Sequence, residues 1–247
     1  MIETIRNNLN EAIDFEFAQG SDASDLNDWI VVLGHGVTGN KDRPIVLDTA
    51  RALNAAGVST LRFSFSGNGD SEGQFTESNV SKEVEDLGAV LDEVSKQYSK
   101  ICYIGHSMGA AVGVIRAAKD SRIQALVSLA GMVDTQAFAQ TEFGEETPDA
   151  GLMWEEEDCP LSSSFMNDLC DTIGSVEPWI SSIQIPWFLA HGTADDVVLP
   201  KDTDLVKRIN GDAVDVLSVE GADHSFNEPA HKQELLAEVV AWFGKQR

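Results

Sequence analysis

Apolar runs of strand length alternate along the chain with segments of helical period. The apolar runs lie at residues 29–33, 59–65, 101–105, 125–130, 186–190 and 214–219. Most of them lack the polar alternation of a one-sided sheet, which predicts strands that are buried on both faces. Residues 12–18 do alternate, and this pattern predicts an early edge strand. Strands that alternate with helices are typical of βαβ units, so the sequence predicts an α/β fold around a mostly parallel sheet.

Segments of helical period separate the predicted strands. They lie at residues 46–56, 80–98, 108–119, 205–209 and 232–243. In the second segment, apolar residues recur at the spacing of one helix face: Val84, Leu87, Val90, Leu91 and Val94. Such a stripe is typical of a helix that packs on a sheet, so we expect helices on both faces of the sheet.

One region, residues 133–182, interrupts this alternation. It mixes acidic residues, serine, glycine and proline with bulky apolar residues: Phe138, Phe143, Leu152, Met153, Trp154, Phe165, Met166 and Trp179. Loops of more than about 15 residues in compact domains are usually functional, so we predict a lid or cap over a pocket. The alternative is a surface excursion whose apolar residues pack down. Residues 1–247 are expected to form one domain that carries this insertion.

The net charge of the chain argues against some classes of binding partner. The chain carries 41 acidic and 17 basic residues, a net charge of −24. Such a surface repels phosphate backbones and anionic lipid, which argues against nucleic acid as a partner. Adaptation to high salt is one hypothesis for this excess, and simple solubility is the other. Neither a signal peptide nor a run of roughly 18 apolar residues is evident, so we expect a cytoplasmic protein without a membrane partner.

Cysteines and acidic runs do not suggest a disulfide framework or a metal site. The three cysteines, Cys102, Cys159 and Cys170, contain no CxxC pair and are odd in number. The acidic run at residues 155–158 has no histidine nearby, and consecutive carboxylates do not converge on one ion. We therefore interpret this run as a solvated acidic surface and expect no metal.

The strongest chemical signal is the run Gly105, His106, Ser107, Met108 and Gly109, between a predicted strand and a predicted helix. A sharp strand-to-helix turn strains the backbone of the serine and crowds its neighbours. Glycines two positions to either side relieve this crowding and let the serine hydroxyl stand at the helix N-terminus. The pattern predicts Ser107 as a nucleophile, and the alternative is a glycine-rich turn without a chemical role.

A serine hydroxyl needs a base that removes its proton, and the chain has five histidines. Three of them lie beside glycines at the ends of predicted strands, where we interpret them as shaping the turns: His35, His106 and His191. His231 lies in the last predicted helix. His224 lies between the last strand and the last helix, at the carboxyl edge of the sheet, and is the predicted base. The alternative is an exposed loop histidine.

The histidine in turn needs a carboxylate that fixes its tautomer and stabilises its charged form. Asp195 and Asp196 follow the predicted strand at residues 186–190, which gives the chain order Ser, Asp, His. We predict Asp195 as this acid, because it falls on the turn while Asp196 leads into the next segment. Asp223 is next to His224 in sequence, but adjacent side chains in an extended loop point apart.

Backbone N–H groups must meet the negative charge that develops on the attacked carbonyl oxygen. The N–H group of Met108, directly after the nucleophile, is one predicted donor. The loop at residues 34–40 follows the first buried strand and is rich in glycine. We predict the N–H group of Val37 as the second donor, and the alternative for this loop is a plain strand-to-helix turn.

At these residues the chain resembles the α/β-hydrolase superfamily, over nearly its whole length apart from the insertion. The loop at residues 36–40, Arg62, Phe63 and the segment at residues 67–75 look like small bacterial carboxylesterases of the cinnamoyl and feruloyl esterase type. The resemblance implies the α/β-hydrolase fold and the cleavage of carboxylic esters through an acyl-serine intermediate, without metal or cofactor. It implies the same roles for Ser107, Asp195 and His224, and for the N–H groups of Val37 and Met108.

The chain departs from these relatives at three positions. They usually carry an aromatic residue in place of Val37, an aspartate in place of Ser64 and a histidine in place of Asn68. The first departure bears on the acyl pocket, and the others bear on loop structure. A peptidase, an acyltransferase or a thioesterase on this scaffold would use the same triad, and a binding module without catalysis is a further alternative. A small-molecule ester is the predicted partner.

Overall fold

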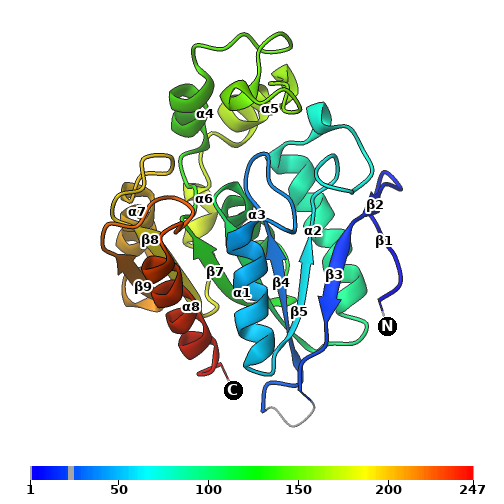
Figure 1. Ribbon diagram of the computed structural model, residues 1–247, viewed down its shortest axis with the longest axis vertical. Coiled ribbons are helices and arrows are strands. Elements are labelled where there is room, and N and C mark those ends of the chain that lie inside the picture. The colour runs from blue at the N-terminus through cyan, green and yellow to red at the C-terminus, as the bar shows by residue number, and fades with distance from the viewer. Residues whose placement is uncertain (1, 22–24, 247) are drawn as a thin grey trace.

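The centre of the molecule is one mainly parallel sheet in a computed structural model that describes residues 2–21 and 25–246 (Figure 1). Among these residues, seven strands form the sheet in the order β3-β5-β4-β6-β7-β8-β9. Only β3 runs antiparallel to its neighbour, β5. The strands are β3 (Phe15–Ala18), β4 (Trp29–Gly34), β5 (Ser59–Phe63), β6 (Lys100–His106), β7 (Ile123–Leu129), β8 (Trp187–Gly192) and β9 (Val214–Val219). The predicted α/β fold is confirmed.

The central strands are buried on both faces, as predicted, but the end of the sheet at β9 differs from the prediction. Every residue of β4 and of β8 is buried. β9 is the last strand of the sheet, and Val216 at its middle is 40 % exposed. The prediction of a buried strand at residues 214–219 is therefore wrong, because this strand has only one neighbour.

The edge strand predicted at residues 12–18 is confirmed, but it is divided. Its second part is β3, which pairs with β5. Its first part, β2 (Ala12–Ile13), pairs instead with β1 (Ile5–Arg6) in a small antiparallel sheet. Asp14 lies between the two parts.

Helices cover both faces of the sheet, as predicted (Figure 1). α1 (Pro44–Ala55) and α8 (Pro229–Phe243) pack on one face. α2 (Val80–Val94), α3 (Met108–Ala117) and α7 (Lys201–Asn210) contribute apolar residues to the core on the other face. Both α1 and α8 begin with a proline, whose missing N–H is not needed at the first helical position.

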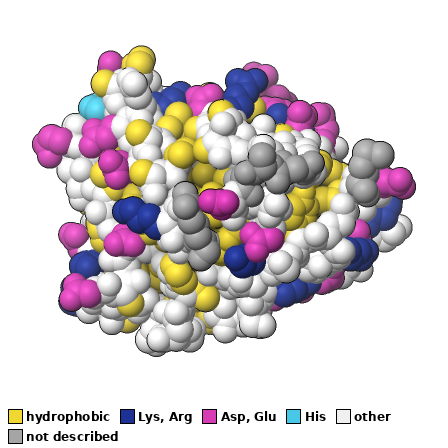
Figure 2. All heavy atoms as spheres, turned by 90° about the horizontal axis from the view of Figure 1, so that it is seen from below, with side chains coloured by type: hydrophobic (Ala, Val, Ile, Leu, Met, Phe, Trp, Pro, Cys, Tyr) yellow, Lys and Arg dark blue, Asp and Glu magenta, His cyan; other side chains and the backbone are white. Residues whose placement is uncertain are grey.

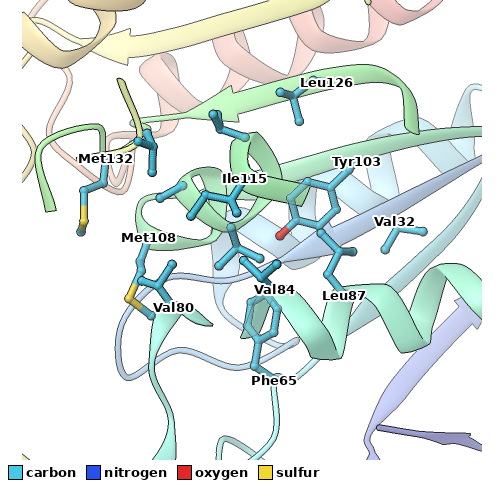
Figure 3. Packing of buried hydrophobic residues seen from close by; sticks show 14 of the residues in the cluster. Val32, Phe65, Val80, Val84, Leu87, Tyr103, Met108, Ile115, Leu126 and Met132 are labelled. Carbon is cyan, nitrogen blue, oxygen red and sulfur yellow. The ribbon is translucent and has the colours of Figure 1, made fainter. Parts of the chain in front are cut away.

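The apolar stripe predicted on α2 is confirmed. Val84 and Leu87 of α2 point toward Tyr103 of β6 and Ile115 of α3 (Figure 3). Leu87 and Tyr103 are 0 % exposed. Removing a side chain of this size from such a core typically costs about 2–5 kcal/mol. The helix ends at Val94 rather than near residue 98.

Two acidic residues of α2 are buried as deeply as its apolar stripe. The Asp86 carboxylate accepts hydrogen bonds from the N–H group and the hydroxyl of Ser66, at 2.8 and 2.7 Å, and from Asn7 Nδ2 at 2.8 Å. The Glu83 carboxyl accepts one from the Ser78 hydroxyl at 3.1 Å. Its other oxygen has no hydrogen-bond partner among the described residues.

The insertion at residues 133–182 lies beyond the carboxyl ends of the strands, at the top of Figure 1. It contains α4 (Thr135–Phe143), η2 (Met153–Glu155), α5 (Ser163–Asn167), η3 (Asp168–Ile173) and α6 (Glu177–Ile180). Aromatic rings from these elements pack on one another, with the centroids of Phe143 and Trp154 4.9 Å apart and those of Phe143 and Phe165 6.1 Å apart. The insertion therefore has a small apolar core of its own, which is continuous with the main core.

The two ends of the insertion are hydrogen-bonded to each other. The N–H group of Val176 donates to the carbonyl oxygen of Val133 at 2.9 Å, and that of Gln136 donates to Gly174 at 2.9 Å. The carboxylate of Asp202 on α7 accepts the N–H group of Val133 at 2.7 Å. The segment therefore leaves the sheet and returns to it at one fixed point.

The surface carries both signs of charge despite the acidic excess. Figure 2 shows the end of the molecule opposite the insertion, where lysine and arginine side chains lie among aspartate and glutamate side chains. One pair at a strand start, Lys100 with Asp28, is 2.9 Å apart. The remaining short helical turns are η1 (Phe75–Glu77) and η4 (Gly211–Ala213). No helix in the described part of the chain is long and apolar enough to cross a membrane.

Candidate active site

Ser107 lies on the sharp turn between β6 and α3. β6 ends at His106 and α3 begins at Met108. The φ angle of Ser107 is 56°, in the left-handed region, which costs about 1–3 kcal/mol for a residue other than glycine. The turn is held by the end of β7 and by the loop that follows it, because Ser107 N–H donates to the carbonyl oxygen of Leu129 at 2.9 Å and the carbonyl oxygen of Ser107 accepts Met132 N–H at 3.2 Å.

Glycines around Ser107 permit a close approach of two backbones. A Cβ atom on Gly105 would overlap the carbonyl oxygen of Gly109, and one on Gly109 would overlap the carbonyl oxygen of His35. A Cβ atom on Gly36 would lie 2.8 Å from Cβ of Ser107. The serine turn and the loop after β4 are therefore packed directly against each other, which brings the predicted nucleophile and the glycine-rich loop together.

Asp195 and His224 meet from the loops that follow β8 and β9. His224 Nδ1 lies 2.8 Å from Asp195 Oδ2. Asp195 Oδ1 accepts the N–H groups of Val197 and Val198, each at 3.0 Å. The Asp195 side chain is buried, whereas Asp196 is exposed. Because Nδ1 donates to the carboxylate, Nε2 is the nitrogen of His224 that remains free to accept a proton.

A second histidine, His191, contacts the same carboxylate oxygen. Its Nε2 lies 3.2 Å from Asp195 Oδ2 and 2.8 Å from the carbonyl oxygen of Val198, and its Nδ1 lies 2.7 Å from Thr203 Oγ1. The carbonyl oxygen can only accept, so Nε2 carries the proton and Nδ1 accepts from the Thr203 hydroxyl. The sequence does not indicate this contact, because a histidine beside a glycine at a strand end predicts only a role in shaping the turn.

Burial alone would raise the pKa of Asp195, but hydrogen bonds from His191 and His224 and the charge of His224 lower it below its ordinary value. The N–H group of Val198 contributes in the same direction. Asp195 therefore keeps its negative charge beside His224, which is the state needed to stabilise a protonated histidine.

His35 fixes the glycine-rich loop that follows β4. Its Nδ1 donates to the carbonyl oxygen of Gly36 at 2.8 Å, and its Nε2 accepts the N–H group of Phe65 at 3.0 Å. Burial, and to a smaller extent the positive charge of Arg43, lower the pKa of His35 to about 4. The ring is neutral at neutral pH, and its two bonds connect the loop to the end of β5.

His106 supports the backbone of His224. Its Nε2 donates to the carbonyl oxygen of His224 at 3.1 Å, and the two ring centroids are 4.8 Å apart. Burial, and then the neighbouring His224, lower the pKa of His106 to about 3. The prediction that these histidines shape the turns beside them is confirmed for His35, whereas the ring of His106 bonds the loop after β9 and that of His191 contacts Asp195.

Val37 and Met108 lie on the two segments that meet at Ser107. Met108 is the first residue of α3, so its N–H group has no partner within the helix. Neither this group nor the N–H group of Val37 donates a hydrogen bond to another part of the described chain. Both donors are therefore available to a ligand beside Ser107.

A cavity of about 330 Å³ opens beside Ser107 and His224. This volume lies within the range of small-molecule sites. Further lining residues come from the loop after β4, from the start of α1 and from the insertion: Val37, Arg43, Ile45, Trp154 and Glu156. The structure thus brings the predicted Ser107, His224 and Val37 to one cavity, with Asp195 buried behind His224.

The described residues contain no group of three or more histidine, cysteine or acidic side chains that could hold a metal ion. Cys102, Cys159 and Cys170 are free thiols. Burial raises the pKa of the Cys159 thiol to about 11, and the adjacent Glu156 adds to this shift. These cysteines are therefore uncharged at neutral pH.

A family of known hydrolases matches the first half of the chain. The family model described as serine aminopeptidase, S33, matches residues 26–146. This segment contains the loop after β4 and the serine turn, but it ends before Asp195 and His224. No curated protein matches the chain.

Solved structures match the chain over almost its whole length. Est1E from Butyrivibrio proteoclasticus with bound ferulic acid is 20 % identical, with a TM-score of 0.84 over 99 % of this chain and 98 % of its own. Alpha/beta hydrolase domain-containing protein 10 from mouse is 20 % identical, with a TM-score of 0.77 over 100 % of both chains. The monoacylglycerol lipase of Paleococcus ferrophilus is 20 % identical, with a TM-score of 0.77 over 95 % of this chain and 99 % of its own.

At these identities the structural matches establish the fold, which is the α/β-hydrolase fold. This fold and the match of the family model to residues 26–146 agree with the resemblance of the sequence to the α/β-hydrolase superfamily.

Proposed function

We propose that this protein is a serine hydrolase that cleaves carboxylic esters through an acyl-serine intermediate. The observation that carries the proposal is the 2.8 Å hydrogen bond from His224 Nδ1 to the buried carboxylate of Asp195. It leaves the other ring nitrogen of His224 available in the cavity that also holds Ser107 on its strained turn. This is the arrangement by which a base activates a serine hydroxyl.

In the first half of the reaction, Ser107 Oγ forms a bond to the ester carbonyl carbon while His224 Nε2 takes the hydroxyl proton. His224 then gives this proton to the oxygen of the leaving alcohol as the ester C–O bond breaks. In the second half, His224 removes a proton from water as the water oxygen attacks the acyl carbon. The bond from this carbon to Ser107 Oγ then breaks, the acid leaves, and His224 returns the proton to Ser107 Oγ. Asp195 stays ionised throughout and stabilises the protonated histidine.

The N–H groups of Val37 and Met108 are the proposed oxyanion hole. Neither of them has a partner in the described part of the chain, and the two segments that carry them are in contact at Gly36 and Ser107. Donors that are fixed before the reaction stabilise the negative charge of the tetrahedral intermediate without a reorganisation cost. His35 fixes the Val37 segment through its bond to the carbonyl oxygen of Gly36.

The names of the matched structures favour an ester substrate over an amide. Est1E has ferulic acid bound, another matched structure is an esterase of Pyrococcus furiosus, and the Paleococcus protein is a monoacylglycerol lipase. The sequence resemblance to small carboxylesterases points the same way. The apolar part of the cavity wall, with Val37, Ile45 and Trp154, suits an apolar acyl or alcohol group.

The test is the hydrolysis of 4-nitrophenyl esters from acetate to palmitate, and of methyl ferulate, by the wild type and by Ser107→Ala. We expect turnover that falls by about 10³-fold or more in the variant, with an unchanged melting temperature. A fluorophosphonate probe should label the wild type. Ser225→Ala is the matched control for labelling, because Ser225 lines the same cavity. Labelling that is kept in Ser107→Ala but lost in Ser225→Ala would contradict the assignment.

A peptidase is the second candidate, because the matched family model is described as a serine aminopeptidase. Its triad would be the same, and only the bond that is cleaved would differ. Aminoacyl 4-nitroanilides separate the two candidates. A larger kcat/KM on these amides than on the esters would favour the peptidase.

The same proposal assigns the role of a lid to the insertion at residues 133–182. Its support is that Trp154 and Glu156 line the cavity beside Ser107. Trp154→Ala would enlarge this side of the cavity. We therefore expect the variant to shift the preferred acyl chain toward longer esters, whereas an insertion that only packs on the surface would leave the preference unchanged.

A further inference from the structure

Arg43 brings a positive charge to the cavity that contains Ser107. It directly precedes α1 and is the only lysine or arginine among the described residues that line this cavity. Its Nη2 donates to the carbonyl oxygen and to the hydroxyl of Thr38, at 3.1 and 3.2 Å. The side chain is thereby anchored on the loop after β4, while its other N–H groups have no partner in the described part of the chain.

No carboxylate of the described residues lies within 4.0 Å of the Arg43 guanidinium. The adjacent Asp42 is occupied elsewhere, because it pairs with Lys41 at 2.9 Å and with Arg62 at 2.6 Å. In a chain with a net charge of −24, carboxylates are the most abundant partners for a cation. An arginine that stays unpaired beside a predicted nucleophile is therefore available to a ligand.

The other charged residue of the cavity, Glu156, belongs to the insertion. One of its carboxylate oxygens lies 3.4 Å from Cys159 Sγ, which donates to it. After burial, both charges act on the Cys159 thiol: Glu156 raises its pKa, and the positive charge of Arg43 lowers it to a smaller extent. Arg43 also contributes, after burial, to the lowered pKa of His35, which holds the loop beside Ser107.

From this arrangement we infer that the ester substrate carries a separate carboxylate group, which Arg43 binds. This inference rests on the proposed esterase function. Guanidinium groups bind carboxylates through paired, charge-assisted hydrogen bonds, and two of these suit the free N–H groups of an anchored arginine. A surface of net negative charge repels such a substrate, so a local cation is needed to bind it next to Ser107.

The experiment compares two esters that differ only in the additional carboxylate. Mono-4-nitrophenyl glutarate carries the acid, and methyl 4-nitrophenyl glutarate is its neutral partner. A second pair, 4-carboxyphenyl butyrate and 4-methoxycarbonylphenyl butyrate, places the group on the alcohol side. The readout is the ratio of kcat/KM for the acid over the neutral ester. We expect a ratio of about 10 or more in one of the two pairs.

Arg43→Gln should lower this ratio by about 10-fold or more, and Arg43→Lys should restore part of it. Any disturbance of the loop through Thr38 affects both esters and cancels in the ratio. Arg51→Gln is the matched control, because Arg51 is an exposed arginine on α1, the helix that Arg43 precedes, and does not line the cavity. Its ratio should equal that of the wild type. A wild-type ratio near 1 in both pairs, or equal losses on acid and neutral esters in Arg43→Gln, would overturn the inference.

Glu156→Gln tests the opposing charge. Its removal should raise the ratio a few-fold, because less repulsion acts on the substrate carboxylate. A lower ratio in this variant would mean that a positive group of the substrate faces Glu156, which contradicts the inference.

A binding measurement separates this inference from the proposed function. Calorimetric titration of glutarate into Ser107→Ala needs no turnover. Binding that is lost in Ser107→Ala/Arg43→Gln supports the carboxylate site even if none of the esters is cleaved. Cleavage of the neutral esters without any glutarate binding would keep the esterase and overturn the site.

Discussion

The carboxyl groups of Asp195 and Glu83 are both buried, but they have different surroundings. Asp195 receives N–H groups from Val197 and Val198 on one oxygen, and His224 and His191 lie at the other oxygen. Glu83 receives the Ser78 hydroxyl on one oxygen, and its other oxygen is without a partner in the described part of the chain.

The two groups therefore shift in opposite directions. Burial raises the pKa of Glu83 well above its ordinary value of 4.5, and the negative charge of Asp86 raises it further. The pKa of Asp195 is lowered, because its hydrogen bonds outweigh the cost of burial. Asp86 is intermediate: burial raises its pKa, although Asn7 and Ser66 donate to it. Burial opposes the charge of all three acids, and only at Asp195 do the hydrogen bonds together with the neighbouring His224 outweigh it.

The largest expected effect is the loss of turnover when Asp195 is replaced. Asp195→Asn keeps the shape but removes the charge that stabilises protonated His224, and it favours the wrong tautomer. We expect kcat to fall by about 10⁴-fold on 4-nitrophenyl butyrate. The exposed Asp196 provides the control, since Asp196→Asn should change kcat less than about threefold. The reverse order of these two variants would move the acid to Asp196.

The next effect concerns one donor of Asp195. His191→Phe removes the N–H group that lies 3.2 Å from Asp195 Oδ2. Hydrogen bonds to charged groups contribute about 1.5–3 kcal/mol, so we expect kcat/KM to fall by about 10- to 100-fold. His191→Gln keeps an amide donor and should recover part of this loss. Equal activity of both variants, at full folding by circular dichroism, would show that His191 does not act through Asp195.

A smaller effect is expected for Asp86. Ser66→Ala removes the hydroxyl that lies 2.7 Å from its carboxylate and should destabilise the protein by about 1–3 kcal/mol at pH 7. The lost bond is to the charged form, so the destabilisation should shrink as the pH falls and Asp86 is protonated. Urea unfolding at pH 7 and pH 4 measures this difference. Ser95→Ala, at the exposed end of α2, should change stability by less than about 0.5 kcal/mol at either pH.

The smallest effect is expected for Glu83, and its sign is opposite. The folded protein holds the proton of Glu83 more tightly than the unfolded chain does, so Glu83 lowers stability as the pH rises above 4.5. Glu83→Gln removes this titration. We expect a gain of about 1 kcal/mol at pH 7 that disappears below pH 4.5. Urea unfolding of the variant and the wild type as a function of pH tests this prediction. A variant that becomes less stable than the wild type as the pH rises would show that Glu83 is ionised in the folded protein.

The sequence predicts an element or a site correctly where the residues of one short segment are enough to indicate its surroundings in the fold. β4 and β8 are buried along their whole length, so their apolar runs could be recognised directly. The glycines around Ser107 are required by the close approach of two backbones, which leaves a short and specific motif. The chain order of Ser107, Asp195 and His224 follows from the order of the strands, and the structure brings these residues together at one edge of the sheet.

The remaining features depend on partners that are far apart in the chain. Asp86 is buried because Asn7 and Ser66 donate to it, and nothing in the sequence of α2 marks it as different from an exposed acid. β9 carries an apolar pattern similar to its neighbours, but its place at the end of the sheet leaves it exposed. The sequence also does not reveal that Arg43 lacks an acidic partner, because only the fold shows that the adjacent Asp42 pairs with Lys41 and Arg62.

The joined ends of the insertion also matter for protein engineering. Val133 and Val176 are hydrogen-bonded to each other, so the chain enters and leaves this segment through a closed stem. Because its two ends are held together in this way, the segment between them is suited to replacement as one unit. A foreign segment grafted between residues 137 and 173 would start and finish at fixed points, and the entropy needed to close the new loop grows only slowly with its length. Under the proposed function, such a graft would change the cavity beside Ser107 while it leaves the sheet and its loops unaltered.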